Sequence, residues 1–234
     1  MKIKSILKKT FTYKLYRAYI DTKHKRQFEK DCAHLRECGM EVLSKFDACM
    51  KELNIPYSLA FGTLLGAVRE HGFIKHDDDI DYTMWIDDYR PEMIDALEKY
   101  GFKHIHSFSV DGDRLGKEDT FLINDILVDI FYVFPPVDKL PYCCWFVDQP
   151  GCRSRKQSIK RYGGLFTRRI EIPIDKSYSH VHFGNLLLPV PANYSNILRC
   201  RYGEDYMIPK PGCKSPTDFI VDWPEKIGVF KSFM

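Results

Sequence analysis

The sequence lacks any long uninterrupted hydrophobic run. Asp, Pro or Gly breaks each apolar stretch before it reaches the roughly 20 residues that a membrane-spanning helix needs. A secretory leader is also missing, because lysines interrupt the apolar residues between Met1 and Ile20 and no small-residue cleavage site follows. The pattern therefore predicts neither a spanning segment nor a signal peptide, and we expect a cytoplasmic protein.

Internal repeats and low-complexity segments are missing as well. No period of about 20 to 50 residues recurs along the chain, so a solenoid or propeller is not expected. The 234 residues are 44% hydrophobic and 29% charged, which excludes a disordered chain and a fibre. This length suits one sizeable core, and we expect one catalytic unit.

A disulfide framework is not expected, although the chain has eight cysteines. Thiols stay reduced in the cytoplasm, so most of these cysteines are interpreted as core residues. Cys143, Cys144 and Cys152 form the densest group. A zinc site there is disfavoured, because adjacent cysteines lack the usual spacer and no nearby His completes four ligands.

No large excess of one charge marks the whole chain, whose formal net charge is +3. Residues 1–30 nevertheless hold ten Lys or Arg against Asp21 and Glu29, which leaves 25 basic and 30 acidic residues in the rest. Nucleic-acid binding is not expected of a slightly acidic body, because tracking phosphates needs a basic groove. We divide the chain into a basic segment, 1–30, and a catalytic domain, 31–234.

The basic segment has the pattern of an amphipathic helix, with apolar residues at steps of three to four: Ile3, Ile6, Leu7, Phe11, Leu15, Ala18 and Tyr19. One interpretation is an interfacial helix on an anionic membrane surface, where each cation contributes about 1 kcal/mol. The other is a helix that packs on its own domain. The sequence leaves both open.

Helix and strand patterns alternate through the middle of the chain. Helices are expected at 27–53, 64–70 and 91–100, strands at 57–61, 80–85 and 126–133, and a turn at 62–63. The stretch 138–176 is rich in Gly, Pro, Cys and basic residues, and we expect it to form loops or an insertion.

Four carboxylates crowd into five positions at the start of an apolar segment: Asp77, Asp78, Asp79 and Asp81. On a strand, residues i and i+2 project to the same side, so Asp79 and Asp81, or Asp77 and Asp79, can converge on one hard cation. The alternative is a solvated turn or a helix cap. Asp129 stands alone in the apolar run 126–133, where an unpaired charge is costly if buried.

If the two strands are neighbours, Asp79, Asp81 and Asp129 are candidates to hold one or two Mg²⁺, and Asp129 to accept a proton from an attacking hydroxyl. Upstream, Gly62 and Thr63 precede a short helix, a combination that favours phosphate binding. Arg69 and Lys75 are the candidate cations for a diphosphate. A phosphate site followed by a metal-binding strand is typical of phosphoryl or nucleotidyl transfer.

These motifs resemble the LicD/fukutin family. The resemblance is carried by Gly-Thr-Leu-Leu-Gly-Ala-Val-Arg at 62–69, Asp-Asp-Asp-Ile-Asp at 77–81 and Val-Asp-Ile-Phe at 128–131. Two later segments, 183–191 and 202–209, are similar to the family's C-terminal signature. The resemblance covers roughly residues 33–211.

The resemblance implies an α/β (α+β) nucleotidyltransferase fold of the polymerase beta type, a small mixed sheet flanked by helices. It implies Mg²⁺-dependent transfer, with Mn²⁺ as a possible substitute, of phosphocholine or a similar phosphorylated alcohol from a CDP-activated donor. The resemblance also implies that the acceptor is a glycan of lipopolysaccharide, capsule or teichoic acid and that CMP is released. By that resemblance Gly62 and Thr63 match the phosphate turn, Asp79 and Asp81 the metal pair, and Asp129 the third carboxylate.

Several points stay open at this stage. An NMP transferase that releases pyrophosphate would use the same metal pair, and a catalytically silent, membrane-associated binding subunit would keep the fold. Lys75-His76 stands where relatives commonly have Pro-Trp, which leaves the cargo unidentified. For a choline cargo the candidate cage residues are aromatic: Tyr82, Trp85, Tyr89, Tyr132 and Trp145. The predicted location is the inner face of a bacterial plasma membrane.

Overall fold

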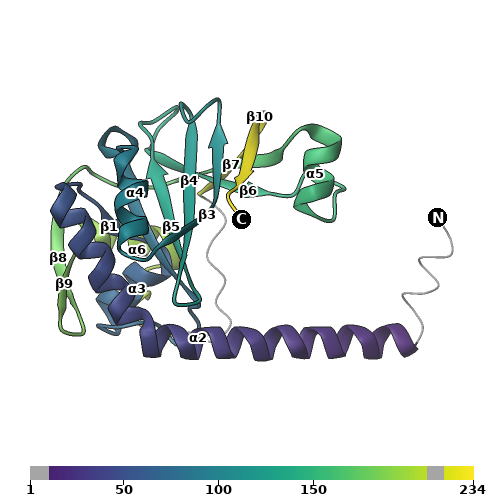
Figure 1. The fold of residues 1–234 in the computed structure, drawn as a ribbon, viewed down its shortest axis with the longest axis horizontal. Coiled ribbons are helices and arrows are strands. Elements are labelled where there is room, and N and C mark those ends of the chain that lie inside the picture. The colour runs from purple at the N-terminus through teal and green to yellow at the C-terminus, as the bar shows by residue number, and fades with distance from the viewer. Residues whose placement is uncertain (1–10, 210–218) are drawn as a thin grey trace.

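The computed structural model describes residues 11–209 and 219–234, and its architecture is mixed α/β (Figure 1). An eight-stranded sheet has the order β1-β2-β5-β4-β3-β10-β7-β6, and β8 pairs with β9 in a separate hairpin. The sheet strands in spatial order are β1 (Ser58–Leu59), β2 (Asp79–Trp85), β5 (Ile126–Val133), β4 (Gly116–Ile123), β3 (Lys103–Val110), β10 (Ile220–Ser232), β7 (Leu165–Glu171) and β6 (Tyr142–Val147). The hairpin is β8 (Tyr178–Phe183) and β9 (Leu186–Pro191), and the helices are α2 (Phe11–Leu53), α3 (Phe61–Arg69), α4 (Glu92–Lys99), α5 (Arg155–Tyr162) and α6 (Tyr194–Tyr202), with a short 3₁₀ helix at Ile86–Asp88.

The main sheet is mixed and curled. β2 and β5 run parallel, and every other described strand pair in it is antiparallel. β6 lies at the opposite end of the strand order from β1, yet it contacts β4 and β5, and Phe134 bridges to Tyr142. The predicted mixed α/β class is confirmed, although the sheet is larger than the small one expected.

One face of this sheet is buried under α2 and α4. Leu43, Phe46 and Met50 of α2 are fully buried there, and the Phe46 ring stacks on Tyr82 with centroids 3.8 Å apart. Tyr82 belongs to the set of alternate β2 residues that faces this core. Because side chains alternate along a strand, the odd-numbered residues of β2 point to the other face.

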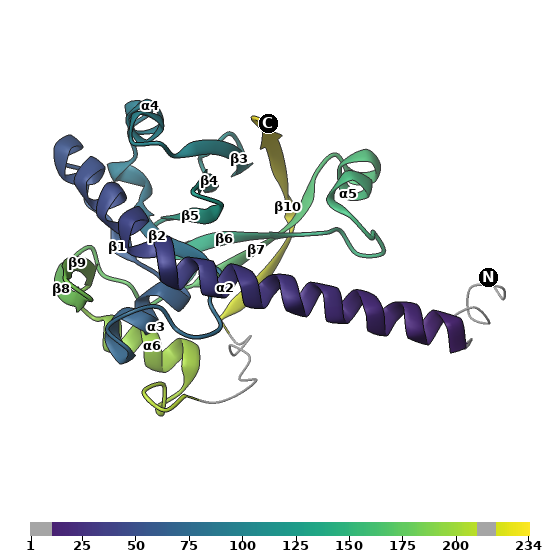
Figure 2. The same cartoon turned by 60° about the horizontal axis from the view of Figure 1, so that its bottom comes forward.

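Helix α2 is a single helix of 43 residues, so the separate helix expected to begin at residue 27 is wrong. The 30/31 boundary of the basic segment falls inside it. Its N-terminal half extends beyond the sheet, and side chains 22–30 are exposed (Figures 1 and 2). All seven residues of the predicted amphipathic face lie outside the residues whose side chains are described. In the described ranges, no helix has the length and apolar character needed to span a membrane.

The prediction of loops for residues 138–176 is wrong, because this stretch contains β6, α5 and β7. The aromatic and cysteine residues at 142–147 form a strand that pairs with β7, as their β propensity favours. Ser154 accepts a hydrogen bond from the Gln157 N–H at the start of α5, and Gly163 ends the helix with a φ of 78°. Gly163 marks the end of α5, whereas most of the basic residues that suggested loops lie within α5 and β7.

Candidate active site

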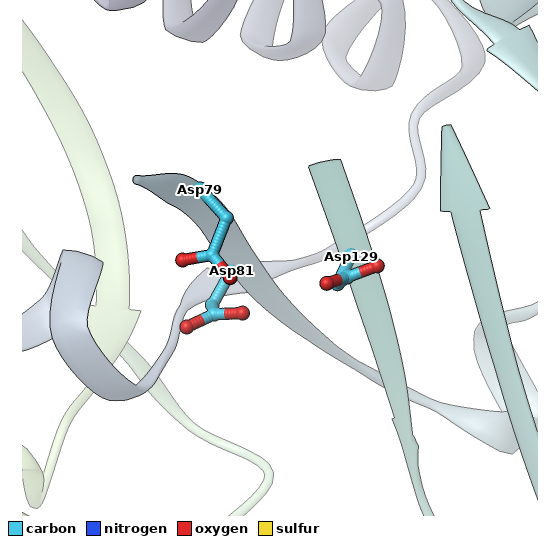
Figure 3. A group of neighbouring side chains, drawn as sticks. All are labelled: Asp79, Asp81 and Asp129. Carbon is cyan, nitrogen blue, oxygen red and sulfur yellow. The ribbon is translucent and has the colours of Figure 1, made fainter. Parts of the chain in front are cut away.

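Three aspartates from two neighbouring strands meet on the face of the sheet opposite α2 and α4. Asp79 and Asp81 lie on β2, and the parallel register places Asp81 beside Asp129 of β5 (Figure 3). One carboxylate oxygen from each of the three lies within 4.8 Å of the others. The alternation of side chains along β2 places Asp79 and Asp81 on the same face. The parallel pairing of β2 with β5 brings the Asp129 carboxylate to them.

Burial raises the pKa of all three carboxyls, and the charges of neighbouring acids add to the rise for Asp79 and Asp81. Burial, together with the charges of Asp129 and Asp78, raises the pKa of Asp79 to about 7. The pKa of Asp81 is raised well above its usual value by burial and then by Asp79 and Asp129. Burial raises the pKa of Asp129 to about 6, although the Thr120 hydroxyl donates a hydrogen bond to its Oδ1 at 2.5 Å. Three crowded carboxylates with raised pKa values suit a hard divalent cation.

Glu118 of β4 is a fourth acid on this face, and the sequence analysis missed it. It stands two residues before Thr120, so both side chains project toward Asp129. Glu118 is buried, and its Oε2 has no hydrogen-bond partner among the described residues. Burial, with the charge of Asp129, raises its pKa well above the usual value. The alternation of side chains along β4 predicts which face of the sheet Glu118 lies on. Only the pairing of β4 with β5 shows that this face also carries the three aspartates.

The next residue, Asp119, points to the opposite face of the sheet and differs from the three aspartates in its partners. Tyr132 donates a hydrogen bond to its Oδ2 at 2.9 Å, His104 Nε2 lies 3.0 Å from its Oδ1, and Lys117 Nζ lies 3.2 Å from its Oδ2. Burial alone would raise its pKa, but the His104 contact, the Lys117 charge and the Tyr132 hydroxyl bring it below the usual value. Asp119 therefore has its counter-charge within the protein, whereas in the described part of the chain no salt bridge neutralises the three aspartates.

Thr63 positions Asp81. The prediction of a turn at 62–63 is wrong, because α3 already begins at Phe61. Thr63 is fully buried, and its Oγ1 accepts a hydrogen bond of 3.0 Å from the Asp81 N–H. The hydroxyl thus fixes the β2 backbone at Asp81. Contact of Thr63 with a phosphate stays a prediction.

Gly62 provides room for the Asp77 carboxylate. A Cβ at Gly62 would lie 2.5 Å from Asp77 Oδ1, so any side chain there displaces the acid. Burial, followed by the charges of Asp79 and Asp78, raises the pKa of Asp77 to about 8. The Asp77 carboxylate therefore explains the glycine in the first turn of α3, and contact of Gly62 with a phosphate stays a prediction.

The two predicted diphosphate cations, Arg69 and Lys75, differ in their surroundings, and their contact with a phosphate stays a prediction. Arg69 is in the last turn of α3, about 10 Å along the helix axis from Gly62. Its Nε donates to Glu70 Oε1 at 2.8 Å and its Nη1 to the Tyr206 carbonyl at 3.3 Å. Lys75 is exposed. Within the described residues, neither side chain forms an ion pair with the three aspartates.

Most of the candidate cage aromatics do not face the aspartates. Tyr82 and Tyr132 are fully buried on the core face, so they are excluded from a cage. The Tyr89 ring already has Lys117 Nζ 4.7 Å from its centroid. Trp85 shares the odd-numbered face of β2 with Asp79, whereas the Trp145 side chain is exposed.

The cysteine group also does not converge. Cys143 and Cys144 are consecutive residues of β6, so their side chains point to opposite faces, and both are buried. Burial raises the pKa of Cys143 to about 12. These are buried thiols, and in the described ranges the three aspartates alone have a metal-ligand arrangement.

Comparison with known proteins gives one family. Residues 54–193, which include all three aspartates, match the family described as LicD/FKTN/FKRP, nucleotidyltransferase domain. The ribitol-5-phosphate transferase FKTN of Mus musculus is 27% identical over 184 residues, 76% of this chain and 35% of that protein. The human FKTN is 23% identical over 179 residues, 74% of this chain and 34% of that protein.

A bacterial relative matches a shorter segment. The lipopolysaccharide cholinephosphotransferase LicD of Haemophilus influenzae is 47% identical over 51 residues, 22% of this chain and 19% of that protein. The chain spans about a third of the length of the FKTN proteins that it matches.

Proposed function

The chain belongs to the LicD/FKTN/FKRP family, and from this premise we propose that it transfers a phosphorylated alcohol from a CDP-activated donor to a hydroxyl of a cell-surface glycan, releasing CMP. The observation that carries the proposal is the group of Asp79, Asp81 and Asp129, with ligand oxygens within 4.8 Å of one another. A reaction at a diphosphate needs charge neutralisation and positioning more than covalent chemistry, and this group fits that need. The mixed sheet with its acidic strands also fits the nucleotidyltransferase fold that we assign to it.

The named relatives support the class of cargo. One is named for ribitol-5-phosphate transfer and another for choline phosphate transfer to lipopolysaccharide. Both names describe an alcohol transferred with its phosphate, although the two alcohols differ. We therefore propose the shared chemistry, a phosphorylated alcohol such as phosphocholine.

We propose that Asp79, Asp81 and Asp129 hold Mg²⁺, for which Mn²⁺ is a substitute. The site fits such a cation because three hard oxygen ligands converge, burial raises the pKa of all three carboxyls, and neighbouring acids raise those of Asp79 and Asp81 further. When bound, the cation supplies charge neutralisation at the donor diphosphate. Asp129 is our candidate to accept the proton of the attacking glycan hydroxyl, because a pKa of about 6 leaves it ionised at neutral pH.

We further propose that the exposed basic part of α2 places the enzyme on an anionic membrane surface, at the cytoplasmic face of a bacterial plasma membrane. Lys23, Lys25, Arg26 and Lys30 are exposed there. Each such cation near an anionic surface contributes about 1 kcal/mol. Acceptors assembled on lipids, as in lipopolysaccharide, capsule or teichoic acid synthesis, would be within reach of such an enzyme.

The test is product analysis with a panel of CDP-alcohols, a crude glycan acceptor, and Mg²⁺ or EDTA. We expect Mg²⁺-dependent CMP release from one donor, loss of release in Asp81→Asn, and wild-type release in Asp87→Asn, which changes an exposed acid near β2. Pyrophosphate release from an NTP would instead establish the nucleotidyl transfer alternative. No product from any donor, with biological output unchanged in Asp81→Asn, would establish the silent binding subunit.

A further inference from the structure

A diphosphate donor needs a cation beside the aspartates, because it would add negative charge to a face that already carries four acids. Divalent cations neutralise part of this charge, and arginine is the usual protein contribution to a phosphate site. Arg69 is already bound to Glu70 and to the Tyr206 carbonyl at the far end of α3. A cation from another element would add to Arg69 and Lys75, whose contact with a phosphate stays a prediction.

Arg201, in the last turn of α6, has unsatisfied hydrogen-bond donors. Its guanidinium lies 4.7 Å from the centroid of the Phe61 ring. Its Nε and Nη1 are buried, and neither has a hydrogen-bond partner among the described residues. Leaving a buried charged donor unpaired is costly, so the arrangement indicates a missing anionic ligand.

Phe61 connects this guanidinium to the aspartates. It is the residue before Gly62, and its ring packs edge-on against Phe131 with centroids 4.9 Å apart. Phe131 stands two residues after Asp129 on β5, and therefore on the same face. Phe61 has a φ of 41°, a conformation that a bulky residue rarely adopts and that is typical of functional sites when packing enforces it.

Tyr202, the next residue after Arg201, lies within electrostatic reach of the same acids. Burial raises the pKa of its hydroxyl to about 12, Asp81 and Asp77 contribute to the rise, and Arg201 opposes it. A largely apolar cavity is lined by Phe61, Thr83, Arg201 and Tyr202, among others. Arg201 therefore lines this cavity beside Tyr202, whose hydroxyl is affected by the charges of Asp81 and Asp77.

We propose that Arg201 binds the phosphate groups of the CDP-activated donor, held flat on Phe61 so that its two unpaired N–H groups meet phosphate oxygens. This inference rests on the proposed function and names a residue that the sequence motifs did not indicate. The planar fork of arginine matches two phosphate oxygens, whereas a lysine offers a single point charge.

The experiment measures the dissociation constant of CDP with Mg²⁺ by calorimetry for the wild type, Arg201→Gln and Arg201→Lys. Arg199→Gln is the matched control, because Arg199 is on the same helix, half exposed, and paired with Glu204 at 3.4 Å. We expect Arg201→Gln to weaken CDP binding by about 10- to 100-fold and Arg201→Lys by less, as for loss of charged hydrogen bonds. Arg199→Gln is expected to stay within about twofold of the wild type, as for an exposed ion pair.

Cytidine, which carries no phosphate, separates phosphate binding from a structural role. In Arg201→Gln, its affinity should stay at the wild-type value while that of CDP falls. An equal fall for cytidine and CDP, or an unchanged CDP affinity, would overturn the inference and leave the proposed function standing. A wild type that binds no cytidine nucleotide would overturn both.

Discussion

Replacing Asp79 with Asn should stabilise the metal-free protein at neutral pH. The folded pKa of Asp79 is about 7, against an ordinary value of 3.8. Because folding raises the pKa of this carboxyl, its contribution to the free energy of unfolding is fully present below pH 3.8. That contribution is lost as the pH rises from 3.8 through 7. Asn has nearly the same shape and never carries the charge, so it avoids this loss.

The magnitude follows from the size of the shift. A rise of roughly three pKa units corresponds to about 4 kcal/mol at pH values above 7. Because Asp79 is only partly buried, solvent screens some of the repulsion, and we expect about half of that, ~2 kcal/mol. For a domain of this size such a gain raises Tm by about 4 to 8 °C.

The assay is urea denaturation in EDTA at pH 7.5, 6 and 5, with Asp87→Asn as the control for an exposed acid. The gain from Asp79→Asn should be largest at pH 7.5 and should shrink steadily toward pH 5. Adding Mg²⁺ should stabilise the wild type and leave the variant nearly unchanged. A variant that is less stable than the wild type at pH 7.5, or a gain that is constant with pH, would refute the reasoning.

Three further substitutions test the surroundings of the site. Thr63→Val removes the acceptor of the buried Asp81 N–H and should cost about 1–3 kcal/mol in urea denaturation; an unfolding curve that superimposes on the wild type would contradict it. Gly62→Ala should cost about 1–3 kcal/mol because the new Cβ would lie 2.5 Å from Asp77 Oδ1, and a double-mutant cycle with Asp77→Ala should recover most of the loss; equal costs in both backgrounds would argue against the contact. Asp119→Asn breaks a buried charge network and should cost about 3–5 kcal/mol by thermal unfolding, whereas a loss below about 1 kcal/mol would show that the network is not structural.

The aspartate group could be predicted from the sequence because it depends on short-range rules. Alternation places Asp79 and Asp81 on one side of a strand, and an isolated acid in an apolar strand, Asp129, needs a counter-charge. The prediction also required the two strands to be neighbours, and β2 and β5 do pair in parallel. The fold class was expected from the family resemblance, and the order of helix and strand patterns through the middle of the chain agreed with it.

The remaining features depend on long-range pairing, which a single sequence does not contain. Glu118 joins the aspartates only because β4 lies beside β5, and Arg201 contacts Phe61 only because the fold brings α6 next to the start of α3. Nothing in the local sequence distinguishes Arg201 from Arg199. Arg69 was predicted as a phosphate ligand because it follows the Gly-Thr motif; it lies in the last turn of the nine-residue helix that begins at Phe61, and its contact with a phosphate stays a prediction.

The central claim is that Asp79, Asp81 and Asp129 form one divalent-cation site, and Mn²⁺ binding followed by electron paramagnetic resonance tests it most directly. The wild type at pH 7.5 should remove free Mn²⁺ from solution, and excess Mg²⁺ should release it. Asp81→Asn should lose this binding, while Asp87→Asn keeps it. A wild type that leaves Mn²⁺ free, or an Asp81→Asn protein that binds it as well as the wild type, would contradict the account.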